Sequence, residues 1–360
     1  MSGAGLQPAS QVGPAGSLAR EPFSPSPSAR ALHGRGTIEA LPRLTSPSSP
    51  PAAAAFTDPA QHLMAPSFLP PPIGVFDSGI GGLSVLRALR AELPHERFVY
   101  LADSAHAPYG ERGDAYVSAR SHAITEYLLE QHGIKALVVA CNTATAAAIH
   151  EVRTRYPQLP SVGLEPAIKP AVAATRTGRI GVIATRGTLA SQKFSRLTQS
   201  MQGQAEFVLQ PCDGLALAIE RSTEHAEAPA SALAEVQALC ARYIGAMGAF
   251  GGQPGQIDTL VLGCTHYIFA HEPLRALVGH EVQLVDSAEA VARQTRRLLH
   301  AAGLLVPAAE APASKLEHPE SVQLLTTGSL AQLEAAAQRW LHLPTTCCGT
   351  AQVPTPGAPA

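Results

Sequence analysis

The amino-acid sequence predicts an α/β protein with two domains of similar construction, each a parallel-rich sheet flanked by helices. Two observations lead to this prediction. From residue 73 onward, apolar runs of about four to six residues alternate with helical stretches of about ten to eighteen, which indicates βαβ units and a parallel sheet. The same alternation starts again at residue 179, which indicates a second domain.

The first series of elements contains three apolar runs and two helical stretches. The runs cover residues 73–76, 97–103 and 136–142, and the helices cover 83–93 and 115–133. In the second series, strands are expected at residues 179–185, 205–210, 259–264 and 281–286, and helices at 189–201, 214–221 and 231–247. A helix at 288–303, a strand at 322–329 and a helix at 330–341 are expected to return to the first domain.

Composition sets the limits of these domains. Residues 1–72 hold 14 of the 31 prolines and are rich in Ser, Ala and Gly, a composition that cannot bury enough surface to offset chain entropy. We interpret this segment as disordered and as an extended reading frame ahead of Met64, with an organelle transit peptide as the less favoured alternative. The predicted organisation is a disordered extension at 1–72, a first domain at 73–165 plus about 287–343, a second domain at 166–286 and a flexible tail at 344–360, with a linker or exposed loop at 306–314.

Charge and cysteine content exclude several classes of function. Only 15% of the 360 residues are charged and the net charge is −2, which provides no field for attracting nucleic acid or a membrane surface. The six cysteines follow neither a disulfide framework nor a Cys-x-x-Cys zinc pattern, so we expect reduced thiols, no metal site and a cytoplasmic location. No apolar run is long enough for a membrane span, and no secretory signal is evident.

The informative polar residues follow the predicted strands, because open parallel sheets bind ligands at the carboxyl ends of their strands. These residues are Asp77 and Ser78, Asp103 and Ser104, Cys141, Asn142 and Thr143, Thr185, Cys264, Thr265 and His266, and Asp286 and Ser287. Two of the groups match each other. Cys141 and Cys264 each follow an apolar strand that ends in a small residue, and each is followed by Thr within two positions.

The matching contexts of Cys141 and Cys264 suggest a pair of acid/base groups. A single cysteine of this kind would more often be a small buried hydrophobe. A cysteine at a strand end and a helix N-terminus, however, has its thiolate stabilised by backbone N–H groups and the helix dipole. One thiol from each domain, facing across a cleft, could remove a proton from one face of a carbon and deliver one to the other. Racemisation or epimerisation is favoured over redox chemistry, which normally uses Cys-x-x-Cys spacing.

A Gly-rich turn after the first strand offers an alternative from another class. Residues 77–84 read Asp-Ser-Gly-Ile-Gly-Gly-Leu-Ser, and a second strand ends at Asp103, which is similar to a dinucleotide fingerprint with its ribose-binding acid. Ser84 replaces the third small residue of that fingerprint, and Asp77 would place negative charge beside a pyrophosphate. A turn that brings backbone N–H groups to a carboxylate is the simpler interpretation, and a nucleotide-binding α/β module stays as the alternative.

Seven segments together resemble the glutamate racemases, within the aspartate/glutamate racemase family. They are IGVFDSGIGGLSVL, LADSAHAPYG, VVACNTATAAAI, IGVIATRGTLASQKF, LVLGCTHYIF, VDSAEAVA and LLTTGS, and they span about residues 73–330 in the family's order. The resemblance implies two pseudo-symmetric α/β domains with the active site in the interdomain cleft, and a homodimer. It also implies an isomerase that interconverts L- and D-glutamate without pyridoxal phosphate, metal or nucleotide. It also implies a role in supplying D-glutamate for peptidoglycan, and hence in cell-wall biogenesis and cell shape.

The resemblance also implies roles for individual residues. Cys141 resembles the base that acts on D-glutamate, Cys264 the base that acts on L-glutamate, and Asp77 and His266 the neighbours that assist them. The groups that resemble the substrate-binding residues are Asp77, Ser78, Tyr109, Gly110, Asn142, Thr143, Thr185, Thr265 and His266. Asp103 and Glu220 are expected to support these groups from behind, although Glu220 could equally be a solvated helix residue. A racemase of the same family that acts on aspartate or another small diacid is the nearest alternative.

Overall fold

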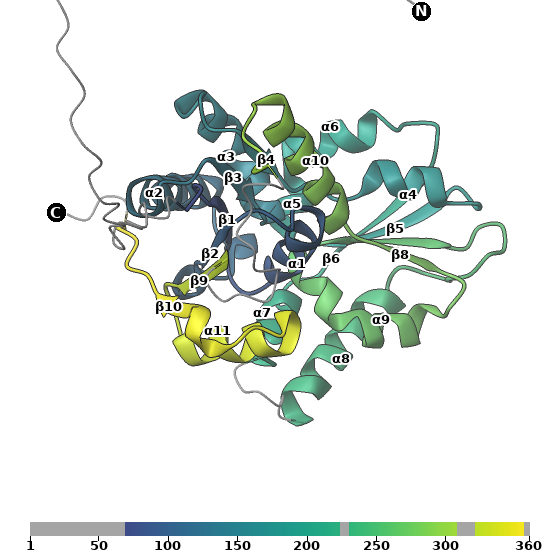
Figure 1. Ribbon diagram of the computed structural model, residues 1–360. Helices are drawn as coiled ribbons and strands as arrows, with labels where there is room; N and C mark the ends of the chain where they lie inside the picture. The colour runs from purple at the N-terminus through teal and green to yellow at the C-terminus, as the bar shows by residue number, and fades with distance from the viewer. Residues whose placement is uncertain (1–68, 224–229, 308–320, 356–360) are drawn as a thin grey trace, which may run out of the picture. The chain divides into compact units, whose positions relative to one another are not determined.

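The computed structural model describes residues 69–223, 230–307 and 321–355, and these residues form two parallel sheets with helices packed against them (Figure 1). The first sheet has the strand order β10-β9-β2-β1-β3-β4 and the second has the order β6-β5-β7-β8. All of the pairings are parallel. The predicted fold class, an α/β protein with two parallel-rich sheets, is therefore confirmed.

The first sheet takes its strands from both ends of the described chain. Its strands are β1 (Ile73–Asp77), β2 (Phe98–Ala102), β3 (Ala136–Val139), β4 (Ser161–Gly163), β9 (Val322–Thr326) and β10 (Cys348–Thr350). The helices around it are α1 (Leu83–Glu92), α2 (Asp114–His132), α3 (Asn142–Arg155), α10 (Ala288–Ala301) and α11 (Leu330–Ala336). We call these elements domain 1.

Domain 1 is apolar on both faces of its sheet, as expected for a parallel sheet between helices. Ile73 and Val75 of β1 belong to a core that also contains Leu86 of α1 and Leu299 of α10. Phe76 points to the opposite face, whose core includes residues of α2 and α3. The near-continuous apolar strands follow from this double burial, and they leave polar side chains only where the strands end.

The second sheet comes from the middle of the chain. Its strands are β5 (Arg179–Ala184), β6 (Glu206–Pro211), β7 (Thr259–Gly263) and β8 (Gln283–Val285). Its helices are α4 (Ile168–Ala174), α5 (Arg186–Ala190), α6 (Gln192–Gln199), α7 (Leu215–Arg221), α8 (Ala230–Gly245) and α9 (His271–Val278). We call these elements domain 2.

The chain passes between the two domains in two neighbouring places. It leaves domain 1 after β4 and returns to it after β8, at the start of α10. The two passages are joined by a hydrogen bond, because Ser287 Oγ donates to the backbone oxygen of Glu165 at 2.5 Å. The two chain segments that connect the domains are therefore held together at this point.

Several local predictions were wrong. The helix expected over residues 189–201 is interrupted at Ser191, whose Oγ accepts from Phe194 N at 3.1 Å and caps α6. Residues 344–360 were expected to be a flexible tail, but residues 348–350 form β10 and pair with β9. The outer edge of β9 would otherwise leave its backbone N–H and C=O groups unpaired, and the three residues of β10 pair with them. The short strand β4 was not predicted.

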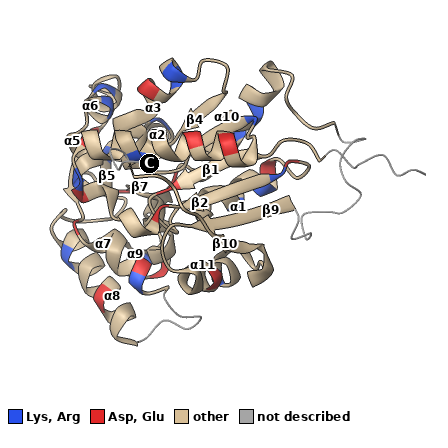
Figure 2. Cartoon of the chain, turned by 90° about the vertical axis from the view of Figure 1, so that its left-hand side faces the viewer, with Lys and Arg blue, Asp and Glu red and all other residues tan. Residues whose placement is uncertain are grey.

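Two other predictions fall mainly outside the described residues. Of the disordered extension expected at 1–72, only residues 69–72 are described, and of the linker expected at 306–314 only 306 and 307 are described. Within the described chain, no helix is long and apolar enough to cross a membrane. Figure 2 shows basic and acidic residues side by side on outer helices such as α8, α9 and α10, in agreement with the small net charge.

Candidate active site

The two strand-end cysteines lie on one cavity, although they belong to different domains. The cavity has a volume of about 30 Å³. Cys141 enters it from the end of β3 and Cys264 from the end of β7. Among the other predicted site residues, those that line the same cavity are Ser78, Tyr109, Gly110, Asn142, Thr143, Thr185, Glu220, Thr265 and His266. Asp77 and Asp103 do not line it and contact residues that do.

Cys141 occupies the position that the sequence predicted for it. It is the residue before α3, and its Sγ accepts a hydrogen bond from Ala144 N at 3.4 Å. The thiol also donates to Ser78 Oγ at 3.9 Å. Burial raises the pKa of the Cys141 thiol, and the nearby charge of Asp77 raises it further, against the lowering effect of the Ala144 N–H. The protonated thiol is therefore favoured in this closed site.

Cys264 differs from the prediction in its immediate surroundings. The segment after it, Thr265–Ala270, is a 3₁₀ helix rather than an α-helix, and none of its backbone N–H groups caps the sulfur. The partner of Cys264 Sγ is His266 Nδ1, at 3.6 Å, which is one of the two neighbours that the resemblance implies. The two thiols thus have similar sequence contexts but different neighbours, a helix N-terminus for Cys141 and an imidazole for Cys264.

His266 connects Cys264 to a buried carboxylate. Its Nε2 lies 2.6 Å from Glu220 Oε1, and the same oxygen accepts from Ile80 N at 2.7 Å. Although burial by itself lowers the pKa of His266, the hydrogen bonds with Cys264 and Glu220 outweigh it and raise the pKa well above its ordinary value. A protonated imidazole is therefore favoured beside the sulfur, to which it can donate a hydrogen bond.

Asp77 is buried behind the cavity between the two domains. Its Oδ2 accepts from Gly82 N at 2.6 Å and from Thr265 Oγ1 at 3.2 Å. Burial raises the pKa of this carboxyl group, against the lowering effect of His266. Its Oδ1 has no hydrogen-bond partner among the described residues. A buried carboxylate oxygen without a partner is costly, so this oxygen is available for a donor on a ligand or on a neighbouring thiol.

Other polar side chains also line the cavity, and some of them have no hydrogen-bond partner among the described residues while others bond to one another. Both Asn142 Oδ1 and Asn142 Nδ2 are buried and unpartnered within the described structure. The hydroxyl groups of Thr143 from domain 1 and Thr185 from domain 2 lie 3.0 Å apart. Thr185 Oγ1 also donates to Thr188 Oγ1 at 2.9 Å. Amide and hydroxyl groups from both domains therefore converge where a small polar ligand would be held.

Asp103 supports the cavity indirectly. Tyr109 Oη donates to Asp103 Oδ2 at 2.5 Å, and the buried guanidinium of Arg120 binds the same carboxylate through Nε at 3.0 Å and Nη2 at 2.6 Å. Thr327 Oγ1 completes the set by donating to Asp103 Oδ1 at 3.0 Å. Arg120 was missed by the sequence analysis. Its signal is a charged residue on the apolar side of α2, one turn before Ile124.

The Gly-rich turn serves contacts between the domains. A Cβ at Gly79 would overlap the carboxylate of Glu220, and a Cβ at Gly81 would lie 2.5 Å from His266 Nδ1 and 2.6 Å from Thr265 Oγ1. These glycines are thus required because side chains of domain 2 approach the backbone closely. The space that a pyrophosphate would need at this turn is filled by Glu220 and His266, which argues against the dinucleotide interpretation.

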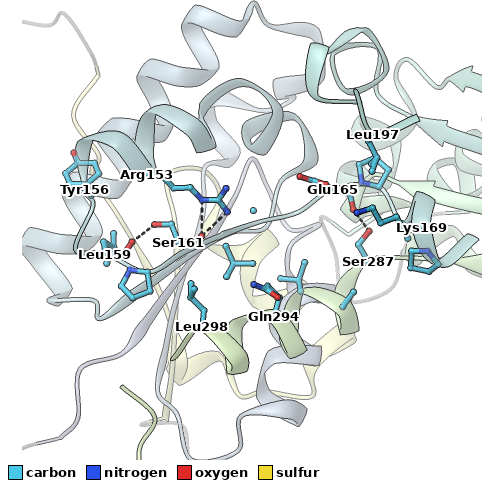
Figure 3. A pocket seen from close by; sticks show the side chains of 18 of the residues that line it. Arg153, Tyr156, Leu159, Ser161, Glu165, Lys169, Leu197, Ser287, Gln294 and Leu298 are labelled. Carbon is cyan, nitrogen blue, oxygen red and sulfur yellow. Dashed lines mark hydrogen bonds between the residues drawn. The ribbon is translucent and has the colours of Figure 1, made fainter. Parts of the chain in front are cut away.

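A second and larger cavity contains none of the residues assigned to catalysis or substrate binding, and of the polar residues that follow the predicted strands it contains Ser287. It has a volume of about 580 Å³ and lies where α3, β4, α4 and α10 meet (Figure 3). Its polar lining includes Arg153, whose guanidinium donates to the backbone oxygen of Ser161 at 3.1 Å, and Lys169. Size alone would select this cavity, but the paired thiols and the unpartnered polar atoms select the smaller one as the active site.

Comparison with known proteins identifies the family of the chain. The chain matches the family model described as Asp/Glu/Hydantoin racemase over residues 82–295. The glutamate racemase of Ectopseudomonas mendocina is 52% identical to it over 228 residues, which cover 63% of this chain and 82% of the relative. The glutamate racemase of Pseudomonas aeruginosa PAO1 is 48% identical over 233 residues, which cover 65% of this chain and 83% of the relative.

Solved structures give the same result. The glutamate racemase isoform RacE1 of Bacillus anthracis has a TM-score of 0.65 and 30% identity, with 79% of this chain and 98% of that chain covered. The Escherichia coli glutamate racemase, solved with L-glutamate and the activator UDP-MurNAc-ala, has a TM-score of 0.61 and 30% identity, with 75% and 96% covered. From the family match, these relatives and the shared fold, the chain belongs to the Asp/Glu/Hydantoin racemase family.

Proposed function

We propose that this protein is a glutamate racemase that interconverts L- and D-glutamate by a two-base mechanism, with Cys264 and Cys141 as the two acid/base groups. The observation that carries the proposal is the single small cavity that both cysteines line from different domains. The names of the relatives, all glutamate racemases at about half identity, support glutamate as the substrate.

In the direction from L- to D-glutamate, the Cys264 sulfur takes the Cα proton and the Cys141 thiol gives its proton to the opposite face of that carbon. The bond from Cα to one hydrogen breaks and a bond to another forms, so the substrate changes only its configuration. In the reverse direction the two residues exchange roles. Each proton transfer is general acid–base catalysis, for which a positioned side chain contributes about 10²- to 10⁴-fold.

The neighbours of the thiols have distinct roles in this proposal. His266 donates toward Cys264 Sγ, and Asp77 stands near Cys141 with one oxygen free of partners. The substrate is held by groups from both domains, among which Asn142 has two unpartnered buried atoms. Ser78, Tyr109, Gly110, Thr143, Thr185 and Thr265 form the rest of the lining that we assign to substrate binding.

The biological setting follows from the same assignment. We propose that the enzyme acts in the cytoplasm as a homodimer, without cofactor, and supplies D-glutamate for peptidoglycan synthesis. Light scattering on the purified chain tests the dimer: a molecular mass of one chain across the working concentration range would contradict it.

The central test is a racemisation assay on protein dialysed against a metal chelator, with no cofactor added. Optical rotation is followed with L-glutamate, D-glutamate and L-aspartate in separate reactions. We expect both glutamate enantiomers to relax to the racemate and aspartate to stay unchanged. Activity on aspartate alone would refute the substrate assignment. Tight binding of NAD in a fluorescence titration, together with no racemisation, would favour the nucleotide-binding alternative.

A further inference from the structure

Glu220 is a junction between the two domains. It lies near the end of α7 in domain 2, and its buried carboxylate receives groups from three segments of the chain. Oε1 contacts His266 Nε2 at 2.6 Å and accepts from Ile80 N at 2.7 Å. Oε2 accepts from the side chain of Gln332 at 3.1 Å, and the same Gln332 Nε2 also donates to the backbone oxygen of Glu220 at 2.9 Å.

Gln332 belongs to domain 1, because α11 follows β9. Its helix continues into a π-helical turn, Ala337–Leu341, which makes two more contacts with domain 2. Arg339 Nη1 donates to the backbone oxygen of Ser222 at 3.2 Å, next to the end of α7. The ring of Trp340 stacks on Phe269 at 4.3 Å between centroids, and Phe269 lies in the same 3₁₀ helix as His266.

We propose that Gln332 is a positioning residue for the Cys264 acid/base group, an assignment that rests on the proposed function. Gln332 fixes the carboxylate of Glu220, Glu220 fixes the imidazole of His266, and His266 points Nδ1 at Cys264 Sγ. Gln332 touches neither the cavity nor the thiol. It acts through two intervening side chains, each of which is buried.

The physical basis is the cost of a buried carboxylate oxygen without a donor. Within the part of the chain that the structure describes, Gln332 is the donor to Glu220 Oε2, while Oε1 is shared by His266 and Ile80. Without Gln332, the Glu220 carboxylate would lower its free energy by rotating toward another hydrogen-bond donor. The His266 imidazole would then no longer be held in the orientation that places Nδ1 beside Cys264 Sγ. Removal of partners that orient metal-binding histidines costs about 10- to 100-fold, and we expect a loss of the same order in kcat/KM.

The assignment also explains why the two domains must be closed around the reactive sulfur. Both donors that hold Glu220 from domain 1, Ile80 N and Gln332 Nε2, reach it across the domain boundary. Cys264 and its imidazole lie in domain 2. The acid/base group of domain 2 is thus aligned by contacts that exist only when domain 1 is in place.

The test compares Gln332→Met with Gln338→Met in the full chain. Methionine keeps the length of glutamine and removes the donor, and Gln338 is an exposed residue of the same C-terminal helical segment. Steady-state rates are measured with L- and D-glutamate, with and without deuterium at Cα. For Gln332→Met we expect kcat/KM to fall in both directions, because the equilibrium constant is one, with KM little changed. Gln338→Met should match the wild type.

The isotope effects separate positioning from a structural role. If the proton transfer at Cys264 becomes slower, the deuterium isotope effect on kcat/KM should rise for L-glutamate, because Cys264 removes the labelled Cα hydrogen from that enantiomer. The isotope effect should fall for D-glutamate, because Cys141 removes the label there and that step limits the rate less. Wild-type rates in Gln332→Met would overturn the assignment, and so would a loss of activity with unchanged isotope effects and a lower melting temperature. A wild-type enzyme that racemises neither enantiomer would overturn the proposed function itself, before any variant is compared.

Discussion

The buried ion pair between Arg120 and Asp103 gives a quantitative prediction for stability. The Arg120 side chain is 1% exposed and that of Asp103 is 0% exposed. In Arg120→Met the apolar stem is retained while the guanidinium and its two bonds to Asp103 are lost. Tyr109 and Thr327 then remain as the donors to a buried carboxylate. Nη1 also binds the backbone oxygen of Pro354 at 2.9 Å, so the C-terminal segment loses an anchor.

The expected cost follows from the difference between buried and exposed pairs. Removing one partner of a buried pair typically costs about 3–5 kcal/mol, because the other charge is left uncompensated. The matched control is Arg155→Met, which breaks the pair with Glu126, where the arginine is 54% exposed. An exposed pair of this kind contributes about 0–1 kcal/mol. Urea unfolding at neutral pH measures both variants against the wild type.

A second substitution separates an uncompensated charge from lost packing. In Arg120→Met combined with Asp103→Asn, no net charge remains buried, so part of the lost stability should return. Racemisation should fall in Arg120→Met as well, since Asp103 holds the hydroxyl of the cavity residue Tyr109. A cost below about 1 kcal/mol in Arg120→Met, equal to that of the exposed control, would refute the reasoning.

Three further predictions concern the chemistry, the turn and pH. Cys141→Ala and Cys264→Ala should each abolish racemisation in the optical rotation assay while melting temperatures stay near the wild type, because each removes the acid or base on one face. Gly81→Ala should lower kcat by at least about 10²-fold, since its Cβ would lie 2.5 Å from His266 Nδ1. The pKa of Asp258 is lowered from 3.8 to about 2, because the hydrogen bonds that its carboxylate accepts outweigh the effect of burial; the donors are Thr175, Arg176 N, Thr177 N and Thr259. The charged carboxylate therefore stabilises the fold above pH 3.8, and this stabilisation is lost as the pH falls toward 2. Asp258→Asn should therefore cost about 1.5–3 kcal/mol at pH 6 and less at pH 3, as measured by urea unfolding.

Each of these has an outcome that would contradict it. Substantial racemisation by either cysteine variant would remove that thiol from the mechanism. Wild-type activity in Gly81→Ala would mean that the turn tolerates displacement of His266. A cost for Asp258→Asn that stays constant between pH 6 and pH 3 would show that the carboxylate is not held in its charged form by these donors.

The sequence predicted the parts of the fold that depend on local patterns. Buried parallel strands are continuous apolar runs, so β1, β3 and β7 are recognisable, and the polar residues at their ends mark the site because parallel strands share one carboxyl edge. The cap of α3 by Cys141 follows from the same position. The three-residue strands β4 and β10 were missed because they carry little pattern, whereas β8, which is equally short, was predicted as part of the strand expected at residues 281–286.

The remaining features depend on contacts between distant segments. Gln332 meets Glu220 across 112 positions of the chain, and no local pattern marks either residue as a partner of the other. The glycines at 79 and 81 indicated a phosphate-binding turn or a carboxylate-binding one, whereas the structure places side chains of domain 2 against them. The helix N-terminus expected after Cys264 is a 3₁₀ helix instead of an α-helix, since the two begin with similar residues, whereas His266 lies beside the sulfur as the resemblance implied.

The small volume of the active-site cavity has a consequence for how the enzyme turns over. At about 30 Å³ the cavity can hold water and is small for a ligand of the size of glutamate. We therefore expect substrate to enter and product to leave when the two domains move apart. Because Ser287 and Glu165 join the two chain crossings, we expect the domains to turn about this point. Such a motion would break and remake the contacts around Glu220 in each cycle, and the rate of opening would then set an upper limit on turnover.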